Sequence, residues 1–284
     1  MSEQRFVQIS KGFFVDPAYR AGLEKLKLTS LDAVFSFGAG KTLTKENLAS
    51  HRNRLRFELD SPPATLFLKR YDAPPVLTQL ANWLSRRRRV SFGFLEFEQA
   101  NNLSAAAIAV PRSVACGEQW GLLFEKRSFV ITEKIPDAES LERRLPHFFD
   151  AAASPENLRL RRDFIRRLAR FVRKFHDAGF RHRDLYLAHI FYGDSGQFHL
   201  IDLARVFQPA LLAERFRVKD IAQVYYSAPA TRFSKTDRLR FYLAYKKSGE
   251  LARKDRLFIK RVTRRARRMA AHDTRHGRSA PFAR

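Results

Sequence analysis

The sequence is poor in cysteine and has no long uninterrupted run of apolar residues. Cys116 is the single cysteine among 284 residues, which excludes an internal disulfide and a cysteine-rich zinc site and suits a reducing compartment. No stretch approaches the roughly 18 apolar residues that a membrane-spanning helix needs. The opening MSEQRFVQIS lacks the apolar core of a signal peptide. We therefore expect a cytoplasmic protein.

Acidic residues are also scarce, which gives the chain a large positive charge. The 54 lysines and arginines exceed the 29 aspartates and glutamates, for a formal net charge of +25. Such a charge attracts polyanions, either nucleic acids or membranes with anionic lipids. It concentrates in SRRRRVS (85–91) and in segment 253–284. Both segments could equally be solvated charge, and because no usual nucleic-acid-binding motif is present, we expect no specific nucleic acid partner.

The first half of the chain has mainly the pattern of strands. Its overall composition, 45% hydrophobic and 13% aromatic, supports a folded core. The runs 54–59 and 64–71 flank the turn cluster DSPP and predict a hairpin, with Lys69 inside the second run. Helices are expected around 76–85 and 92–107, followed by short strands with turns at Gly117 and Gly121.

The second half of the chain has mainly the pattern of helices. Apolar residues recur at helical spacing before the helix stop at Gly179: Phe164, Ile165, Leu168, Phe171, Val172 and Phe175. Two short strands, 189–192 and 198–203, follow with a hairpin turn between them. A basic helix and a disordered tail, AHDTRHGRSAPFAR, end the chain. We predict an α+β protein with a β-rich part over 1–135, a helical part over 136–252 and a basic C-terminal segment over 253–284.

One group of residues has the character of a catalytic site. His182, Arg183 and Asp184 follow the long helix directly, and the next hairpin leads to Asp202 in LIDLAR. Phosphoryl transfer needs a carboxylate beside the attacking hydroxyl, a second carboxylate for a metal and a lysine for the nucleotide phosphates. Asp184, Asp202 and Lys69 supply these groups, in the chain order of a protein-kinase-like phosphotransferase.

The motifs around these residues resemble the lipopolysaccharide kinase family, the Kdo and core heptose kinases with a protein-kinase-like fold. HRDLYLAHIF carries His189 where ordinary kinases have asparagine, and LIDLAR replaces the usual Asp-Phe-Gly. LFLKRY, EKRSFVITEKIPDAESLE and KDIAQVYYS extend the resemblance over roughly residues 30–250. It implies a small β-rich N-lobe, a larger mainly helical C-lobe, and transfer of phosphate from ATP to a heptose or Kdo hydroxyl of the lipopolysaccharide inner core.

The resemblance also implies roles for the residues of the catalytic loop. Asp184, flanked by Arg183 and His182, accepts or orients the proton of the substrate hydroxyl. Asp202 binds Mg²⁺, and His189 stands at the position of a second metal ligand, although imidazole is a poor ligand for Mg²⁺. His182 is expected to pack and to bind the backbone of the loop.

Further roles concern the nucleotide. Lys69 contacts the α- and β-phosphates and pairs with Glu96, or otherwise with Glu98. The carbonyl of Glu133 and the amide of Ile135 bind adenine. In the C-lobe, Asp220 holds the catalytic loop from below. The acceptor is lipopolysaccharide core or another anionic glycolipid, and basic patches place the enzyme peripherally at the inner face of the cytoplasmic membrane.

Several alternatives stay open at this point. Lys69 could be an edge-strand lysine that prevents aggregation. His182, His189 and Asp202 could form a metal site of two histidines and one carboxylate. The chain could also be a protein or small-molecule kinase of the same fold, or a pseudokinase or polyanion-binding module. No glycine-rich sequence occurs in NLASHRN (47–53), and the run Gly38-Ala39-Gly40-Lys41 is not a P-loop.

Overall fold

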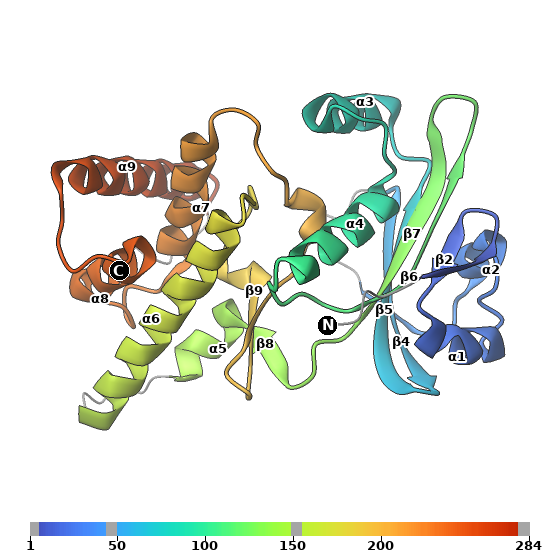
Figure 1. Ribbon diagram of the computed structural model, residues 1–284, viewed down its shortest axis with the longest axis horizontal. Coiled ribbons are helices and arrows are strands. Elements are labelled where there is room, and N and C mark those ends of the chain that lie inside the picture. The colour runs from blue at the N-terminus through green and yellow to red at the C-terminus, as the bar shows by residue number, and fades with distance from the viewer. Residues whose placement is uncertain (1–5, 44–49, 149–154, 278–284) are drawn as a thin grey trace. The chain divides into compact units, whose positions relative to one another are not determined.

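The structure, a computed structural model, describes residues 6–43, 50–148 and 155–277 (Figure 1). The chain forms two compact units. The first contains Met1–Ala105 and Val110–Pro136, and the second contains Ala106–Ala109 and Asp137–Arg284. Each unit has its own sheet and helices, described in turn below.

An antiparallel seven-stranded sheet is the centre of the first unit, in the order β1-β2-β6-β7-β5-β4-β3. Its strands are β1 (Val7–Ser10), β2 (Phe13–Val15), β3 (Lys41–Thr42), β4 (Arg52–Asp60), β5 (Pro63–Asp72), β6 (Ser113–Trp120) and β7 (Glu125–Glu133). The predicted hairpin is confirmed as β4 and β5, which pair in continuous register from Arg52↔Tyr71 to Asp60↔Pro63.

Helices cover both faces of this sheet. Side chains alternate between the faces of a strand, so Leu68 and Ile131 bury themselves with the short helices η1 (Pro17–Tyr19), α1 (Arg20–Lys25) and α2 (Leu31–Ser36). Val130 and Cys116 face the other way, against Phe97 of α4 (Phe92–Ala105). Lys69 is the register partner of Val130, and therefore lies on the α4 face of the sheet.

The first turn of α4 is held very close to strand β7. The Gly93 amide donates to Ser128 Oγ at 2.8 Å, and the Phe92 amide donates to Glu125 Oε2 at 3.1 Å. A side chain at position 93 would place its Cβ within 2.6 Å of the Phe129 carbonyl oxygen. Only glycine therefore allows this approach of helix to sheet.

One predicted turn in the first unit is wrong. Gly117 lies inside β6 rather than at a chain reversal, opposite Phe129 of β7. A Cβ there would lie 2.4 Å from the Phe129 ring. The glycine makes room for an aromatic side chain of the neighbouring strand, so its presence does not mark a turn.

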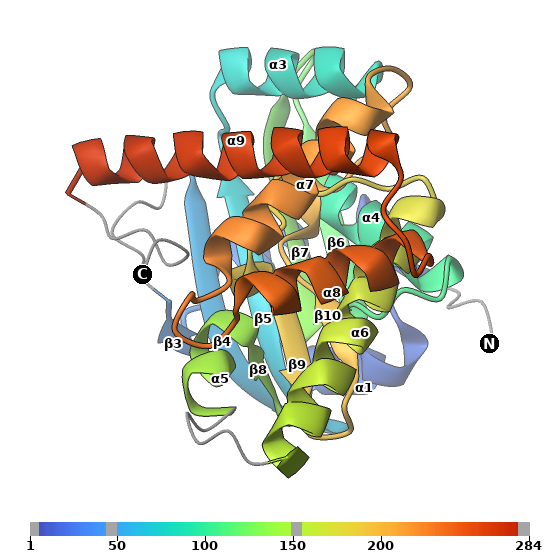
Figure 2. The same ribbon diagram turned by 90° about the vertical axis from the view of Figure 1, so that its left-hand side faces the viewer.

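The second unit is mainly helical around a small sheet, ordered β10-β9-β8. Its elements are β8 (Ala138–Ser140), α5 (Leu141–Phe148), α6 (Pro155–Asp177), η2 (Leu187–His189), β9 (Ile190–Gly193), β10 (Phe198–Leu200), η3 (Leu203–Arg205), α7 (Ala213–Ser227), α8 (Lys235–Lys246) and α9 (Arg253–Arg275). The predicted apolar stripe of α6 packs inward, and the helix ends before Gly179 at φ +87°. Helix α6 contacts α8, and α7 contacts α9 (Figure 2).

The C-terminal helix continues further than the sequence predicts. Residues 271–275, expected to be disordered, belong to α9. The Tyr226 hydroxyl of α7 donates to the Asp273 carboxylate, which ties this last turn to the core of the unit. The remainder of the predicted tail, residues 278–284, lies outside the described residues.

We expect Gly93→Ala to destabilise the first unit by about 1–3 kcal/mol, the usual effect of forcing atoms into a packed interior. In an open helix the same change would stabilise by up to about 1 kcal/mol. Thermal unfolding followed by circular dichroism measures the difference. Gly38→Ala is the control, because a Cβ at residue 38 would meet nothing within 4 Å. An unfolding temperature of Gly93→Ala at or above the wild-type value would contradict the close approach.

Candidate active site

Lys69 and Glu96 form a buried ion pair in the first unit. Lys69 Nζ on β5 donates to Glu96 Oε1 on α4, and the Tyr71 hydroxyl donates to Glu96 Oε2 at 3.2 Å. Both carboxylate oxygens of Glu96 are thus engaged, and the side chain of Glu96 is only 5% exposed. Glu98, the alternative partner, instead pairs with Arg88. The two glutamates diverge because a step of two residues turns a helix by about 200°.

The reading of Lys69 as an edge lysine is wrong. Strand β5 lies between β4 and β7 in the sheet order, so the backbone groups of Lys69 are flanked by strands on both sides. A cation on an interior strand has no role in blocking edge-to-edge pairing. The buried position of Lys69 is instead accounted for by its ion pair with Glu96.

The segment after β7 presents backbone groups in alternating directions. The Lys134 amide donates to the Thr65 carbonyl at 2.8 Å, whereas the Glu133 amide donates to the Arg112 carbonyl at 2.9 Å. The Glu133 amide therefore points away from β5, on which Leu66 is the register partner of Glu133. Its carboxylate accepts a hydrogen bond from Tyr19 at 2.8 Å, and burial together with this bond raises the pKa of Tyr19 to about 12. Ile135, two residues after Glu133 in the chain, has a buried side chain.

In the second unit, the backbone of residues 181–189 is held by one face of α7. The fully buried carboxylate of Asp220 accepts hydrogen bonds from the amides of His182, at 2.9 Å, and Arg183, at 3.1 Å. Further along α7, Gln223 accepts from the Leu185 amide at 2.9 Å, and Ser227 accepts from the Leu187 amide at 3.0 Å. Residues 220, 223 and 227 follow helical i, i+3, i+7 spacing, so one helix face binds four amides of the loop between residues 182 and 187.

The sequence pointed to Asp220 but not to Gln223 or Ser227. The segment DIAQVYYS could have indicated both residues. They lie on the same helix face as Asp220, and their side chains can accept hydrogen bonds from backbone amides. Gln223 also donates to the Arg183 carbonyl at 2.8 Å. It therefore satisfies a donor and an acceptor of the same loop.

His182 and Arg183 serve to position the loop. His182 is fully buried, and its Nε2 is 2.9 Å from the Ile201 carbonyl, which joins the loop to the residue before Asp202. Burial lowers the pKa of His182. Arg183 has left-handed backbone (φ +65°), and its guanidinium lies 4.1 Å from the centre of the Phe207 ring. These contacts turn both side chains toward protein groups.

Asp184 carries the partly exposed carboxylate of the loop. One of its oxygens lies 3.1 Å from Arg205 Nε and the other 3.9 Å from Lys219 Nζ. Burial lowers the pKa of Lys219. His189 contacts the Asp184 carbonyl through Nδ1 at 2.7 Å, not the carboxylate. The sequence analysis does not predict a role for Arg205 or Lys219. Both lie next to predicted site residues in the chain: Arg205 is in the LIDLAR motif of Asp202, and Lys219 directly precedes Asp220.

Asp202 follows β10 and also has left-handed backbone, with φ +58°. Among residues 6–43, 50–148 and 155–277, no group of three or more His, Cys, Asp or Glu side chains could hold a metal ion. The alternative site of two histidines and one carboxylate is therefore wrong. The physical reason is that His182 Nε2 and His189 Nδ1 both contact backbone carbonyls.

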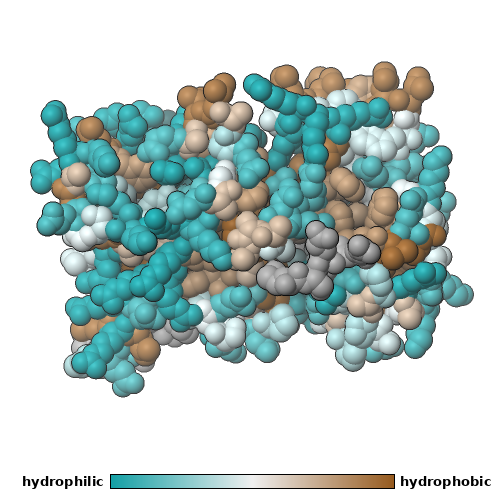
Figure 3. Space-filling model, viewed as in Figure 1, coloured by the Kyte–Doolittle hydropathy of each residue, from teal (hydrophilic) through white to brown (hydrophobic). Residues whose placement is uncertain are grey.

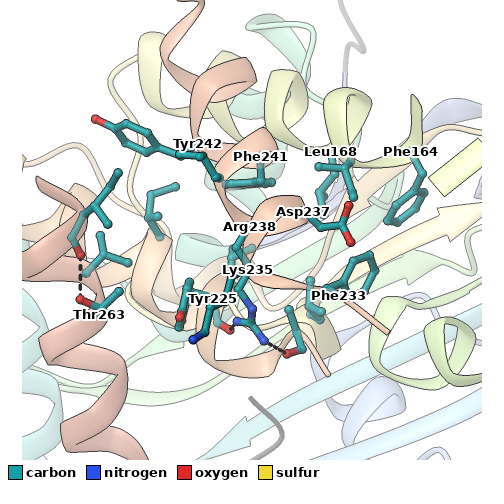
Figure 4. Close-up of a pocket in the computed structure, with 18 of the residues that line it drawn as sticks. Phe164, Leu168, Tyr225, Phe233, Lys235, Asp237, Arg238, Phe241, Tyr242 and Thr263 are labelled. Atoms are coloured by element: carbon teal, nitrogen blue, oxygen red, sulfur yellow. Dashed lines mark hydrogen bonds between the residues drawn. The ribbon is translucent and has the colours of Figure 1, made fainter. Parts of the chain in front are cut away.

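An apolar cavity of about 200 Å³ lies elsewhere in the second unit (Figure 4). Phe164 and Leu168 of α6 face Phe233 and the α8 residues Phe241 and Tyr242 across it. Asp184 and Asp202 do not line this cavity. Such an apolar lining disfavours the binding of a charged phosphoryl group.

Comparison with known proteins identifies relatives over most of the chain. Residues 81–245 match the lipopolysaccharide kinase (Kdo/WaaP) family. The lipopolysaccharide core heptose(I) kinase WaaP of Escherichia coli K12 is 32% identical over 201 residues, which cover 68% of this chain and 74% of that protein. WaaP of Pseudomonas aeruginosa is 28% identical over 191 residues, with 64% and 70% covered.

Two further comparisons concern substrate and fold. The 3-deoxy-D-manno-octulosonic acid kinase of Vibrio cholerae is 30% identical over 115 residues, 40% of this chain and 44% of that protein. A solved structure, WaaP in complex with acyl carrier protein, is similar with a TM-score of 0.68 and 24% identity, covering 93% of this chain and 99% of that one. These matches confirm the resemblance expected from the sequence and the protein-kinase-like fold.

We expect the second unit to lose stability as the pH falls below 6.5, partly through His176. Burial is the main cause that lowers the pKa of His176, which contacts Asp220 through Nε2 at 3.2 Å. A histidine with a lowered folded-state pKa binds fewer protons than in the unfolded chain, so stability is full above pH 6.5 and decreases as the pH falls toward the folded-state pKa. The slope is at most about 1.4 kcal/mol per pH unit for one group.

Thermal unfolding between pH 7.5 and 5 measures this slope. His176→Gln should make the decrease shallower than in the wild type. His272→Gln, at an exposed position, should leave it unchanged. If His176→Gln and wild type lose stability in parallel, the protonation of His176 does not contribute.

Proposed function

The chain belongs to the lipopolysaccharide kinase family, and we propose that it uses ATP to phosphorylate a sugar hydroxyl, of heptose or Kdo, in the lipopolysaccharide core. The relatives matched over about two thirds of the chain are core heptose(I) kinases, and the shorter match is a Kdo kinase. This difference in coverage favours heptose as the acceptor. The observation that carries the proposal is the buried Asp220, which holds the loop that bears Asp184.

Asp184 is proposed to act on the acceptor. Its carboxylate orients the sugar hydroxyl and accepts the proton as the hydroxyl oxygen attacks the γ-phosphorus of ATP in line. The new oxygen–phosphorus bond forms while the bond to the ADP oxygen breaks. Arg205 holds one oxygen of Asp184 at 3.1 Å, which restricts the rotation of the carboxylate. His182 and Arg183, which the family resemblance places in the catalytic loop, are proposed to position this loop.

Residues of the first unit are proposed to bind the nucleotide. Lys69 would contact the α- and β-phosphates, and its ion pair with Glu96 holds the ammonium group in place. The carbonyl of Glu133 and the amide of Ile135 would bind adenine. The Glu133 carboxylate accepts a hydrogen bond from the Tyr19 hydroxyl, so the backbone of Glu133 is the part proposed to bind adenine.

Asp202 is the residue that would hold Mg²⁺. The ion commonly binds one or two carboxylates together with phosphates and water, rather than a cage built from protein alone. When bound, Mg²⁺ supplies charge neutralisation for the phosphates. His189, predicted as a second ligand, is instead assigned to positioning, because its Nδ1 contacts the loop carbonyl of Asp184.

The pseudokinase alternative is not favoured. The Lys69–Glu96 pair and the loop with Asp184 are both assembled. The segment that would stand where other kinases have a glycine-rich loop joins β3 to β4, and residues 44–49 of it lie outside the described residues.

Replacement of Asp184 provides the direct test. The wild type should transfer labelled phosphate from ATP, with Mg²⁺, to lipopolysaccharide extracted from cells that lack core sugar kinases. Asp184→Asn should lower kcat about 10²–10⁴-fold, the usual contribution of a general base, with little change in the KM for ATP. Asp194→Asn, at an exposed position of the same unit, is the control.

The other outcomes of this assay are also informative. Transfer that survives in Asp184→Asn would contradict the role of Asp184. If the wild type binds Mg-ATP but phosphorylates only proteins or free sugars, the acceptor proposal fails while the kinase assignment holds. Absence of nucleotide binding would overturn the proposal as a whole.

We also propose that the enzyme works on an anionic membrane surface. No helix among the described residues has the length and apolar character to cross a membrane. Helix α3 (Val76–Arg86) supports this idea because its apolar face points to solvent. Leu77 and Leu84 are 80% and 83% exposed, whereas Gln79 is the buried residue of the helix.

A turn between β6 and β7 extends this apolar face. Leu122 at its tip is 95% exposed. Gln79 fixes the turn to α3, since its side chain exchanges hydrogen bonds with the backbone of Glu125 at 2.8 and 3.2 Å. Trp83 also stacks on Phe124 with ring centres 5.6 Å apart. Hydrophobic side chains gather over α3 and this turn in Figure 3.

Basic residues border the apolar face. Arg86 ends α3 and Arg87 to Arg89 follow it directly, and Arg89 lies 4.2 Å from the centre of the Trp120 ring. Each basic residue near an anionic bilayer contributes about 1 kcal/mol, and exposed apolar patches with a polar border commonly mark interaction surfaces. An anionic bilayer offers partners for both the leucines and the arginines.

We expect the triple variant Leu77→Ser, Leu84→Ser, Leu122→Ser to bind vesicles containing anionic phosphatidylglycerol at least ten-fold more weakly in a sedimentation assay. Phosphate transfer to a deacylated, soluble acceptor should stay within two-fold of wild type. The control replaces three leucines that are exposed elsewhere, Leu160, Leu211 and Leu257. Equal vesicle binding by wild type and the first variant would exclude this surface.

A further inference from the structure

A groove of about 830 Å³ runs along the second unit between α7 and α9. Four of its lining residues are arginines of α9, and a fifth comes from α7: Arg261, Arg264, Arg265, Arg268 and Arg215. We call this feature the arginine groove. Its volume falls in the range of sites that enclose a small ligand, and exceeds what a single ion needs.

The helix pattern explains why these arginines gather. Residues 261, 264, 265 and 268 follow i, i+3, i+4, i+7 spacing and share one face of α9. The neighbouring face carries Phe258, Val262 and Ala266, which are buried. Because α9 packs on α7 (Figure 2), the arginine face lies along the side of this contact. Arg215 completes the groove from α7.

The charge of the arginine groove is not balanced from within. Its five arginines outnumber its two acids, Glu214 and Asp273. Glu214 lies 3.4 Å from Arg217, and Asp273 accepts a hydrogen bond from the Tyr226 hydroxyl and lies 3.4 Å from His272 of the groove. Within the part of the chain that the structure describes, none of the five arginines forms an ion pair or a side-chain hydrogen bond. Like charges in one concave site repel each other and attract anions, so a bound anion would stabilise this arrangement.

The groove reaches the catalytic loop. Tyr186, two residues after Asp184, lines it. Burial raises the pKa of Tyr186, and the charges of Asp184 and Arg265 both act on this side chain. Lys219 likewise interacts with Arg265 and lies 3.9 Å from the Asp184 carboxylate. Because Tyr186 lines the groove, one end of the groove lies at the loop that carries Asp184, the residue proposed to receive the acceptor hydroxyl.

We propose that the arginine groove binds a phosphate group already present on the acceptor glycolipid and thereby directs the acceptor hydroxyl toward Asp184. This inference rests on the proposed function and identifies the acceptor class as a phosphorylated saccharide. Guanidinium groups bind phosphate oxygens through paired hydrogen bonds. The nucleotide has proposed partners of its own, Lys69 and Asp202. A concave site beside the loop suits a discrete phosphate better than a flat bilayer.

The test compares two double variants that each remove two positive charges from α9. Arg264→Gln with Arg268→Gln alters the arginine groove. Arg256→Gln with Arg267→Gln alters exposed residues of the same helix that do not line it. Calorimetry without nucleotide measures binding of deacylated lipopolysaccharide, which keeps its sugar phosphates, before and after phosphatase treatment. Circular dichroism verifies that both variants fold.

We expect the groove variant to bind the phosphorylated saccharide at least ten-fold more weakly than wild type, and the control variant to stay within two-fold. After phosphatase treatment the three proteins should bind equally weakly. In the transfer assay, the groove variant should raise the acceptor KM at least ten-fold, with kcat and the KM for ATP unchanged. This split distinguishes positioning of the acceptor from damage to the catalytic loop.

Three results would overturn the inference. The first is equal binding of the phosphorylated saccharide by the wild type and the groove variant. The second is wild-type binding that phosphatase treatment does not weaken. The third is a groove variant that loses only its affinity for phosphatidylglycerol vesicles, which would assign the groove to the membrane. If wild type binds the saccharide as expected but transfers no phosphate, the proposed function fails and the groove assignment stands.

Discussion

The buried carboxylate of Asp220 is the constraint on which the candidate site depends. A carboxylate without water must receive several hydrogen bonds to be tolerated, and Asp220 obtains them from the amides of His182 and Arg183 and from His176. The left-handed backbone of Arg183 is held by the same contacts. As a result, the side chain of the neighbouring Asp184 has a fixed orientation, while its carboxylate remains partly exposed.

In the first unit, buried hydrogen bonds likewise position a candidate site residue, here the Lys69–Glu96 ion pair. A lysine on an interior strand and a glutamate on a helix can meet only if the helix lies very close to the sheet. Gly93 permits this approach, and Glu125 and Ser128 bind the first amides of α4. The helix position therefore depends on residues one turn away from Glu96. In both units, buried polar groups with no proposed contact to substrate determine the positions of the side chains that are proposed to bind substrate.

The basic residues that give the chain its high positive charge lie in several different structural environments. Part of it borders the exposed leucines of α3, part lines the groove between α7 and α9, and part is paired, as in the contact of Arg112 with Asp16. The net charge of +25 thus describes several local environments. The proposed acceptor, a phosphorylated glycolipid in a membrane, offers complementary chemistry to the first two of them: acyl chains and headgroups for one, and sugar phosphates for the other.

The sequence by itself determined the family, the helix α6 and the β4–β5 hairpin, and it indicated the loop that is proposed to be catalytic. These features depend on local spacing and on short motifs, which need no knowledge of distant contacts. It also indicated Lys69 and Glu96, but could not exclude Glu98, because the choice depends on how α4 is rotated against the sheet. The sequence predicts a turn at Gly117, because the Phe129 ring that requires a glycine there belongs to another strand and leaves no local signal. Only the tertiary structure decided that Arg205 and Lys219 lie beside Asp184, that Gln223 and Ser227 hold the loop, and that the arginines of α9 share a groove with Tyr186. Each of these contacts joins residues on separate elements, and the packing of those elements alone brings the groups within reach of one another.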